Sequence, residues 1–307
     1  MLVPVIAVLL SCEKENLGDE QRIVTDGDGL SVLPGLFTVN AGADSIKGNE
    51  DDKRVRFSSG NLYCIKNTVN DSISYTFAFE DQQYKYHTRY GKVHYDANGN
   101  SINGNAVTDV LFPGIQYTLN QSGFFQWVSR NAVGATQDIL SSYGAFSSLT
   151  ATKCVGEGSD CVDFGLTVGS PWFTLSIDEW MYLVNGRPNA ANLIGWAMVN
   201  GIPGTVIAPD GWDCGSFPIC GDGATADYDG DEWTSAESKG LVFLPAAGYF
   251  GQAGSKVYGV GVHGCYWSLS ANGSGCAFAV DFNSNGQETL PDGRRNGYSV
   301  RLVCSGN

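Results

Sequence analysis

Short runs of alternating apolar and polar residues, bounded by Gly, Asn or Asp, recur along this chain and constrain its fold more than any other feature. Alternation with a period of two is typical of a β-strand with one buried face, and the bounding residues are typical of turns. Such runs occupy residues 36–39, 54–57, 61–65 and 75–79. Glycine supplies 40 of the 307 residues. Because each glycine inside a helix costs about 1 kcal/mol, an all-helical fold is excluded.

Two segments are nevertheless predicted to be helical. In residues 176–186, Ser176 and Glu179 have the spacing of a capping box, apolar residues recur every three or four positions, and Gly186 is typical of a helix end. A second short helix is predicted over residues 234–239, before an apolar strand at 241–245. Short strands together with about two helices and long loops indicate an α+β fold.

Near the C-terminus the sequence predicts a hairpin whose faces can be assigned residue by residue. The turn signal Asn272-Gly273 separates two strands with a period of two. The inward positions are predicted to be Cys265, Trp267, Leu269, Cys276, Phe278, Val280 and Phe282. The outward positions are predicted to be Ser268, Ser270, Asp281 and Asn283. In the last strand, the inward residues are predicted to be Tyr298, Val300, Leu302 and Cys304, alternating with Ser299 and Arg301.

The first residues predict export and lipid anchoring. Residues 2–10 form an uncharged apolar run that is too short to span a bilayer and is typical of a signal peptide. The run ends in Leu-Leu-Ser-Cys, which resembles the bacterial lipobox and implies acylation of Cys12. The acids that follow resemble an export signal to the outer face of the outer membrane. We expect a signal peptide at 1–11, an acylated tether at 12–34, a folded domain at 35–307, and a surface-exposed outer-membrane location.

Eight cysteines remain after Cys12, an even number that predicts disulfides in an oxidising compartment. Two pairs are close in sequence within polar loops, and we expect Cys154 to pair with Cys161 and Cys214 with Cys220. The remaining four allow three connectivities, and the sequence does not choose among them: Cys64, Cys265, Cys276 and Cys304.

Four ordered blocks resemble surface lipoproteins of gut anaerobes that carry a formylglycine-generating-enzyme-like domain. Residues 172–183 resemble its helix block R-L-P-T-E-A-E-W-E-Y-A, and the other stretches lie at 55–63, at 242–249 with 264–268, and at 295–303. The resemblance covers about residues 35 to 304. It implies a C-type-lectin-like fold of the formylglycine-generating-enzyme subtype, with a small twisted antiparallel sheet, two helices and long loops.

The same resemblance bears on catalysis and on variability. The enzymes of that family oxidise a substrate cysteine with a C-x4-C pair and copper, and this chain contains no C-x4-C. We therefore expect no enzymatic activity and no catalytic residue. The domain also resembles the variable proteins of diversity-generating retroelements, whose mutable interval corresponds here to Leu269 through Tyr298.

Metal and nucleic acid are both disfavoured as partners. Asp227, Asp229 and Asp231 alternate as in a calcium loop, but the glycine and glutamate that complete the pattern are missing. A solvated acidic loop is therefore expected and no cofactor is predicted, with calcium bound by these three residues as the weaker alternative. With 18 Lys and Arg against 32 Asp and Glu, the net charge of −14 provides no basic surface for a phosphate backbone. Trp212 and Trp233 are expected in the core rather than stacked on sugar.

The interval 268–298 is rich in side chains that form adaptable hydrogen bonds, as antibody loops are. The predicted ligand-binding residues are Ser268, Ser270, Asn272, Asp281, Asn283, Asn285, Arg294 and Arg295. The paired arginines suit a carboxylate. The predicted function is therefore a surface lipoprotein that binds a protein or glycan without catalysis. The alternatives are a diverged formylglycine-generating or glycan-processing enzyme, and a structural component of a surface fibre.

Overall fold

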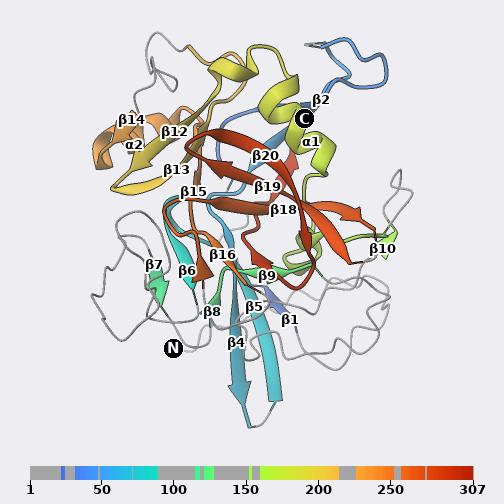
Figure 1. Ribbon diagram of the computed structural model, residues 1–307, viewed down its shortest axis with the longest axis vertical. Coiled ribbons are helices and arrows are strands. Elements are labelled where there is room, and N and C mark those ends of the chain that lie inside the picture. The colour runs from blue at the N-terminus through green and yellow to red at the C-terminus, as the bar shows by residue number, and fades with distance from the viewer. Residues whose placement is uncertain are drawn as a thin grey trace, which may run out of the picture.

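The computed structural model (Figure 1) describes residues 22–24, 32–47, 49–70, 72–88, 115–117, 121–127, 152–153, 160–213, 226–251, 257–273 and 275–306. In these ranges short strands, most of them paired antiparallel, accompany two α-helices, which confirms the α+β class. Each of the four alternating runs near the N-terminus matches a strand, although the first and third runs begin one residue early: β2 (Phe37–Asn40), β3 (Lys53–Phe57), β4 (Leu62–Val69) and β5 (Ser72–Phe79).

The C-terminal sheet is the frame of the candidate site. It has the order β10-β11-β18-β19-β20, and its last three strands form consecutive antiparallel hairpins. The strands are β10 (Thr152–Lys153), β11 (Asp160–Cys161), β18 (Gly264–Asn272), β19 (Cys276–Asn283) and β20 (Gly286–Gly293). The pairing of β18 with β19 shifts register between Trp267 and Ala271, so β18 contains a bulge.

The other sheets surround this frame. One has the order β14-β12-β13-β15 and comprises β14 (Ala226–Tyr228), β12 (Ile194–Val199), β13 (Ile202–Ile207) and β15 (Val242–Pro245). A second has the order β17-β16-β21-β9 and comprises β17 (Val257–Tyr258), β16 (Tyr249–Phe250), β21 (Gly297–Tyr298) and β9 (Phe125–Gln126). A third joins β2 and β3 to β22 (Val303–Ser305).

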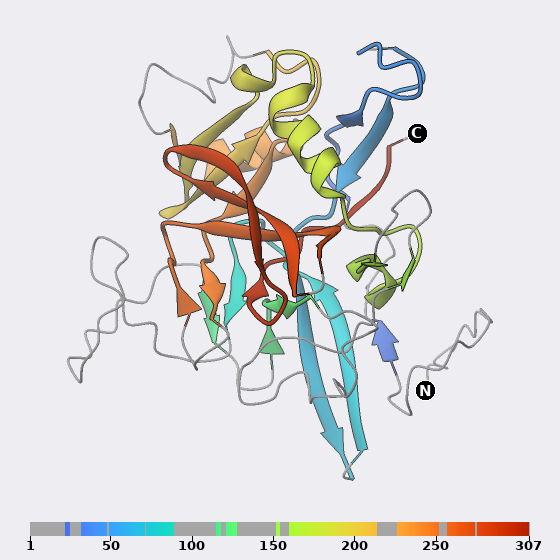
Figure 2. The same cartoon turned by 45° about the vertical axis from the view of Figure 1, so that its right-hand side comes forward.

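Two further groups of strands lie in the N-terminal half. The order β1-β5-β4-β8 adds β1 (Arg22–Val24) and β8 (Gln121–Ser122) to the β4–β5 hairpin, while β6 (Tyr86–Thr88) pairs with β7 (Ile115–Tyr117). Figure 2 shows the β4–β5 hairpin projecting from the rest of the molecule. Its base stays packed, because Leu62, Cys64 and Phe77 are buried in the core.

Both helices begin at a capping box. At α1 (Ile177–Met181) the Ser176 hydroxyl accepts from the Glu179 N–H at 3.2 Å and the Glu179 carboxylate accepts from the Ser176 N–H at 2.9 Å, as predicted. A π-helical turn, Tyr182–Gly186, continues α1 to the predicted end. The second helix, α2 (Gly230–Ser238), begins earlier than the predicted residue 234 because Asp229 caps it. Two 3₁₀ turns occupy Phe164–Thr167 and Ala190–Asn192.

Three apolar clusters form the core. The first lies on one side of the β18–β19 hairpin and joins it to β4, β5 and β9. The third lies on the other side and joins the same hairpin to α1, β2, β3 and β15. The second joins α2 to the β12–β13–β15 sheet and includes Trp233, as predicted, with Trp212 partly buried against it. The C-terminal hairpin is therefore a central layer with apolar contacts on both faces.

The chain after β20 differs from the single alternating strand that the sequence predicts. It forms the short strands β21 and β22, separated by residues without regular pairing. Tyr298, Val300 and Leu302 are buried as expected, but Ser299 and Arg301 are buried as well. The Arg301 guanidinium is held by neutral amides, donating to Gln83 Oε1 at 2.6 Å and to Asn61 Oδ1 at 3.3 Å.

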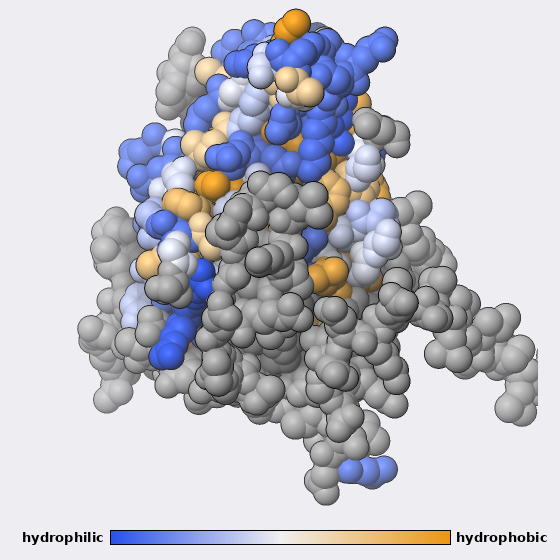
Figure 3. All heavy atoms as spheres, turned by 90° about the vertical axis from the view of Figure 1, so that its right-hand side faces the viewer, coloured by the Kyte–Doolittle hydropathy of each residue, from blue (hydrophilic) through white to orange (hydrophobic). Residues whose placement is uncertain are grey.

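The described surface is mainly polar. Figure 3 faces the right-hand side of Figure 1 and shows hydrophilic side chains over most of the described part of that face, with small apolar patches between them. Among the described residues, Ile46 and Leu166 are the large apolar side chains that are exposed, at 61% and 46%. No helix in the described ranges is both long enough and apolar enough to cross a membrane.

Candidate functional site

Six of the predicted ligand-binding residues lie on β18, on β19 or on the turn between β19 and β20, and the other two, Arg294 and Arg295, lie on the turn between β20 and β21. The prediction of one buried and one free face on this hairpin is wrong. Trp267 pairs with Ala279 and shares the first core cluster with it, whereas Val280 and Phe282 belong to the third cluster on the opposite face. Alternation reveals which residues share a face, but it does not reveal that a second apolar layer covers the other face.

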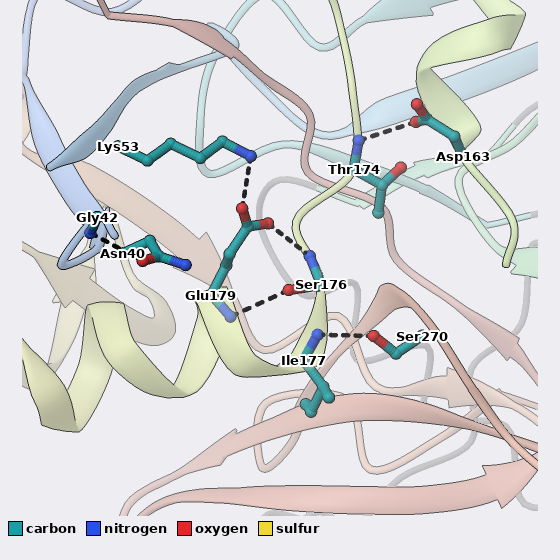
Figure 4. A network of polar contacts seen from close by, with 9 residues as sticks. All are labelled: Asn40, Gly42, Lys53, Asp163, Thr174, Ser176, Ile177, Glu179 and Ser270. Atoms are coloured by element: carbon teal, nitrogen blue, oxygen red, sulfur yellow. Dashed lines mark hydrogen bonds and ion pairs between the residues drawn. The ribbon is translucent and has the colours of Figure 1, made fainter. Parts of the chain in front are cut away.

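Ser268 and Ser270 are buried and serve the backbone around the bulge. The Ser268 hydroxyl donates to the Phe278 carbonyl at 2.6 Å and accepts from the Ser270 N–H at 3.2 Å. The Ser270 hydroxyl accepts from the Ile177 N–H at 3.1 Å, at the start of α1 (Figure 4). The two serines therefore satisfy backbone groups that the bulge and the helix start leave unpaired, and they do not lie on a free outer face.

Asp281 is also buried, with 4% of its surface exposed. Its carboxylate accepts from His263 Nδ1 at 2.8 Å, from the Asn283 amide at 3.1 Å and from the Cys265 thiol at 3.5 Å. Burial, with the nearby Asp281 carboxylate, raises the pKa of Cys265 well above its usual value of 9.0. Cys265 is therefore a neutral thiol that donates to a carboxylate, and it lacks the thiolate character of a catalytic cysteine.

The two arginines have different environments. The Arg294 side chain is buried, and its guanidinium donates to the Cys276 carbonyl at 2.9 Å and to the Gly273 carbonyl. The same guanidinium lies 4.4 Å from the centroid of the Trp127 ring. Arg295 is exposed, and no described residue pairs with its guanidinium. Only Arg295 of the pair is therefore oriented to meet a ligand.

Arg294 holds two exposed turns side by side. Its backbone N–H donates to the Gly275 carbonyl at 3.2 Å and its guanidinium donates to the Gly273 carbonyl, so residues 272, 273 and 275, at the end of β18, lie against residues 293–296, at the end of β20. Asp292 stabilises the second turn by accepting from the Asn296 amide at 2.6 Å and from the Tyr298 hydroxyl. We call these two segments the paired turns. They present Asn272 and Arg295 to solvent.

The structure separates the predicted residues into two groups. Asn272 and Arg295 lie on the paired turns, at the end of the sheet where β19 begins. Asn283 and Asn285 lie on the turn between β19 and β20, at the opposite end. Eight residues of β19 separate the two ends by about 20–25 Å. A single small ligand therefore cannot contact both groups, although a large protein or glycan surface can.

The three alternating aspartates after residue 226 lie in a strand and at the start of a helix. Asp227 lies in β14, Asp229 is the N-cap of α2, and Asp231 lies in the first turn of that helix. The Asp229 carboxylate accepts from the Glu232 N–H at 3.1 Å. Asp229 and Asp231 therefore belong to a helix start, where carboxylates satisfy free N–H groups and favour the positive end of the helix dipole. Asp227 belongs to a strand, so the three acids do not form the expected loop, although all three are exposed to solvent. No group of three metal-ligating side chains gathers in the described ranges.

Most of the cysteine predictions fall outside the described residues. Cys12, Cys154, Cys214 and Cys220 lie there, and only the backbone of Cys161 is described. No disulfide joins the remaining four to one another, so none of the three connectivities left open by the sequence is formed: Cys64, Cys265, Cys276 and Cys304. Cys276 is partly exposed and the other three are buried.

Sequence reasoning missed three residues that organise this region. Trp127 directly follows β9, and its indole N–H donates to the Ser268 carbonyl at 3.0 Å. His263 reaches Asp281 from the turn before β18, and Asp292 supports the second of the paired turns. Trp127 and His263 carry no local signal of these roles, because their contacts join positions 141 and 18 apart in sequence, whereas Asp292 bonds to Asn296 four positions on.

Comparison with known proteins adds one match. The profile of a family described as a domain of unknown function (DUF8237) matches residues 227–303, which run from β14 to the start of β22 and include the paired turns. No curated protein matches the chain. No solved structure matches it either.

Proposed function

We propose that this protein is a lipid-anchored surface protein that binds a protein or glycan through the paired turns, without catalysis. We further propose the C-type-lectin-like fold of the formylglycine-generating-enzyme subtype, on the strength of the sequence blocks. The observation that carries the binding proposal is the fixation of two exposed polar turns by one buried arginine.

Turns that are already held in place favour affinity, because ordering a loop during binding costs free energy. Each immobilised side chain or loop residue subtracts about 0.5–1.5 kcal/mol from affinity, and a turn that is already held avoids that loss. Arg294 forms three hydrogen bonds across the paired turns, through its backbone N–H and its guanidinium. The turns are thereby held in one geometry before any ligand arrives.

The exposed chemistry of the paired turns favours an acidic ligand group. Arg295 offers a planar fork of N–H donors that fits a carboxylate, and Asn272 adds an amide with both donor and acceptor atoms. The chain as a whole is acidic, with a net charge of −14. An exposed arginine therefore distinguishes the paired turns from a surface that is mainly negative. Carboxylates of acidic peptides and of acidic sugars are the ligand groups that this pattern suits.

The absence of a catalytic cysteine pair in the sequence supports a binding role. Among the described cysteines, Cys265 donates to the Asp281 carboxylate that His263 also contacts, but it is 1% exposed and has a raised pKa. A buried neutral thiol is a poor nucleophile, since the thiolate is the reactive form. The lipobox and the polar tether support display at the cell surface.

The proposal is tested by probing glycan and protein arrays with the full chain in mild detergent. We expect binding to ligands that carry carboxylates, and a loss of roughly tenfold or more in affinity for Arg295→Ala, because a hydrogen bond to a charged group contributes about 1.5–3 kcal/mol. Lys47→Ala is the matched control, since Lys47 is an exposed cation outside the paired turns. Absence of any ligand, or equal losses in the two variants, would refute the proposal.

A further inference from the structure

An ion pair joins a solvent-facing imidazole to a buried carboxylate. His263 Nδ1 lies 2.8 Å from Asp281 Oδ2 and 3.1 Å from Oδ1. The Asp281 side chain is 5% exposed and the His263 side chain is 39% exposed. The pair connects two elements, because His263 precedes β18 and Asp281 lies in β19. Protons in solvent therefore have access to one partner of a largely buried pair.

His263 closes a tight turn, residues 259–263, whose two glycines at left-handed φ values of 67° and 77° allow the chain to reverse. A hydrogen bond from the Gly248 N–H to the His263 carbonyl at 2.7 Å holds the end of this turn. Val260, within the turn, is completely buried in the second core cluster. The hydrogen bond between the His263 imidazole and Asp281 then joins the turn to the sheet.

The surroundings of His263 favour its charged form. The charged groups that face the imidazole are Asp281 from β19 and Glu288 from β20. The neutral titratable groups next to the pair are Cys265 of β18 and Tyr249 of β16. The hydrogen bond to Asp281 raises the pKa of His263 above its usual value of 6.5, and partial burial opposes this effect without reversing it.

We propose that the His263–Asp281 pair is a pH-sensitive latch that holds the turn 259–263 against the β18–β19 hairpin. Protonated His263 forms a charged pair with the carboxylate. When His263 loses its proton, the ion pair becomes a hydrogen bond from a neutral imidazole to the carboxylate, while Asp281 keeps the donors from Cys265 and Asn283. The Asp281 carboxylate in the sheet then keeps hydrogen-bond donors, and the turn 259–263 is the segment that loosens.

The direction of the pH effect follows from the raised pKa. A histidine whose pKa is higher in the folded protein contributes stability that is fully present below its unfolded value of about 6.5. This contribution disappears as the pH rises through the folded pKa of His263, which lies above 6.5. The latch is therefore closed in mildly acidic solution and open in alkaline solution.

The first measurement is the NMR titration of the His263 imidazole in the full chain. We expect a pKa above 6.5 that falls in Asp281→Asn, and that falls less in Glu288→Gln, which removes a charge but keeps the direct contact. A pKa at or below 6.5 in the unmodified chain overturns the proposal. Because this result needs no variant, the proposal remains testable even if Asp281→Asn does not fold.

The second measurement is amide exchange at residues 259–263, corrected for the intrinsic pH dependence of exchange. We expect protection to fall about two- to fivefold between pH 5.5 and pH 8.5, the range for an ion pair with one exposed partner. His263→Gln should remove this pH dependence, whereas a His87→Gln, His94→Gln double variant should retain it. Constant protection in the unmodified chain, or the same pH dependence in His263→Gln, contradicts the latch.

Discussion

The guanidinium of Arg294 lies 4.4 Å from the centroid of the Trp127 ring, and the backbone N–H of Trp127 donates to the backbone carbonyl of Arg294 at 2.9 Å. The two residues are far apart in sequence, yet together they close one end of the C-terminal sheet. Trp127 also donates to the Ser268 carbonyl, so β9 is fastened to both β18 and the turn after β20. The paired turns therefore rest on a buried support and not on solvent-exposed contacts alone.

Arg294→Ala should lower the free energy of unfolding by about 1–3 kcal/mol, because two carbonyl acceptors lose their charged donor and the contact with Trp127 is lost. Arg295→Ala should change it by less than about 0.5 kcal/mol, since that side chain is exposed. Urea unfolding of both variants measures the difference. Similar stabilities for the two variants would show that Arg294 does not support the turns.

Ser176→Ala should destabilise the protein by about 1 kcal/mol, because it removes the N-cap of α1. Ser270→Ala should be destabilising by about 1–3 kcal/mol, since the Ile177 N–H then loses its acceptor in a buried position. Thermal unfolding compares them with Ser235→Ala on the exposed face of α2. A neutral Ser270→Ala would show that its hydroxyl does not support the start of α1.

Thiol reactivity should follow exposure and pKa. In the folded protein at pH 8, Cys276 should react with iodoacetamide first, because it is partly exposed, whereas Cys265 should react only after unfolding. Mass spectrometry of trypsin fragments, taken over time, gives the order. Non-reducing peptide maps of the same sample should contain the pairs Cys154–Cys161 and Cys214–Cys220 and no disulfide among the other four. Rapid modification of Cys265 would contradict its buried position.

Cys12→Ser should abolish lipid acylation, because no other cysteine follows a small residue within an apolar leader. Metabolic labelling of cells with a palmitate analogue measures the modification, and Cys276→Ser serves as the control that should keep its label. Label that persists in Cys12→Ser would overturn the lipoprotein assignment.

Local signals in the sequence were sufficient for several elements. The capping box of Ser176 and Glu179 involves residues three positions apart, so its spacing is visible without any tertiary information. One local signal was overlooked: Asn200-Gly201 is a strong hairpin turn sequence, and both residues have positive φ, at 51° and 76°, between β12 and β13. That hairpin was predictable from the chain alone.

By itself, the sequence determined the α+β class, the position of most early strands and the start of α1, because these depend on period and on neighbours a few residues away. Only the tertiary structure decided that Ser268, Asp281 and Arg301 are buried. Their burial depends on partners from distant segments, such as Gln83, which lies 218 positions from Arg301. A polar residue in an alternating strand is outward only when nothing covers its face, and covering layers are assembled by the fold.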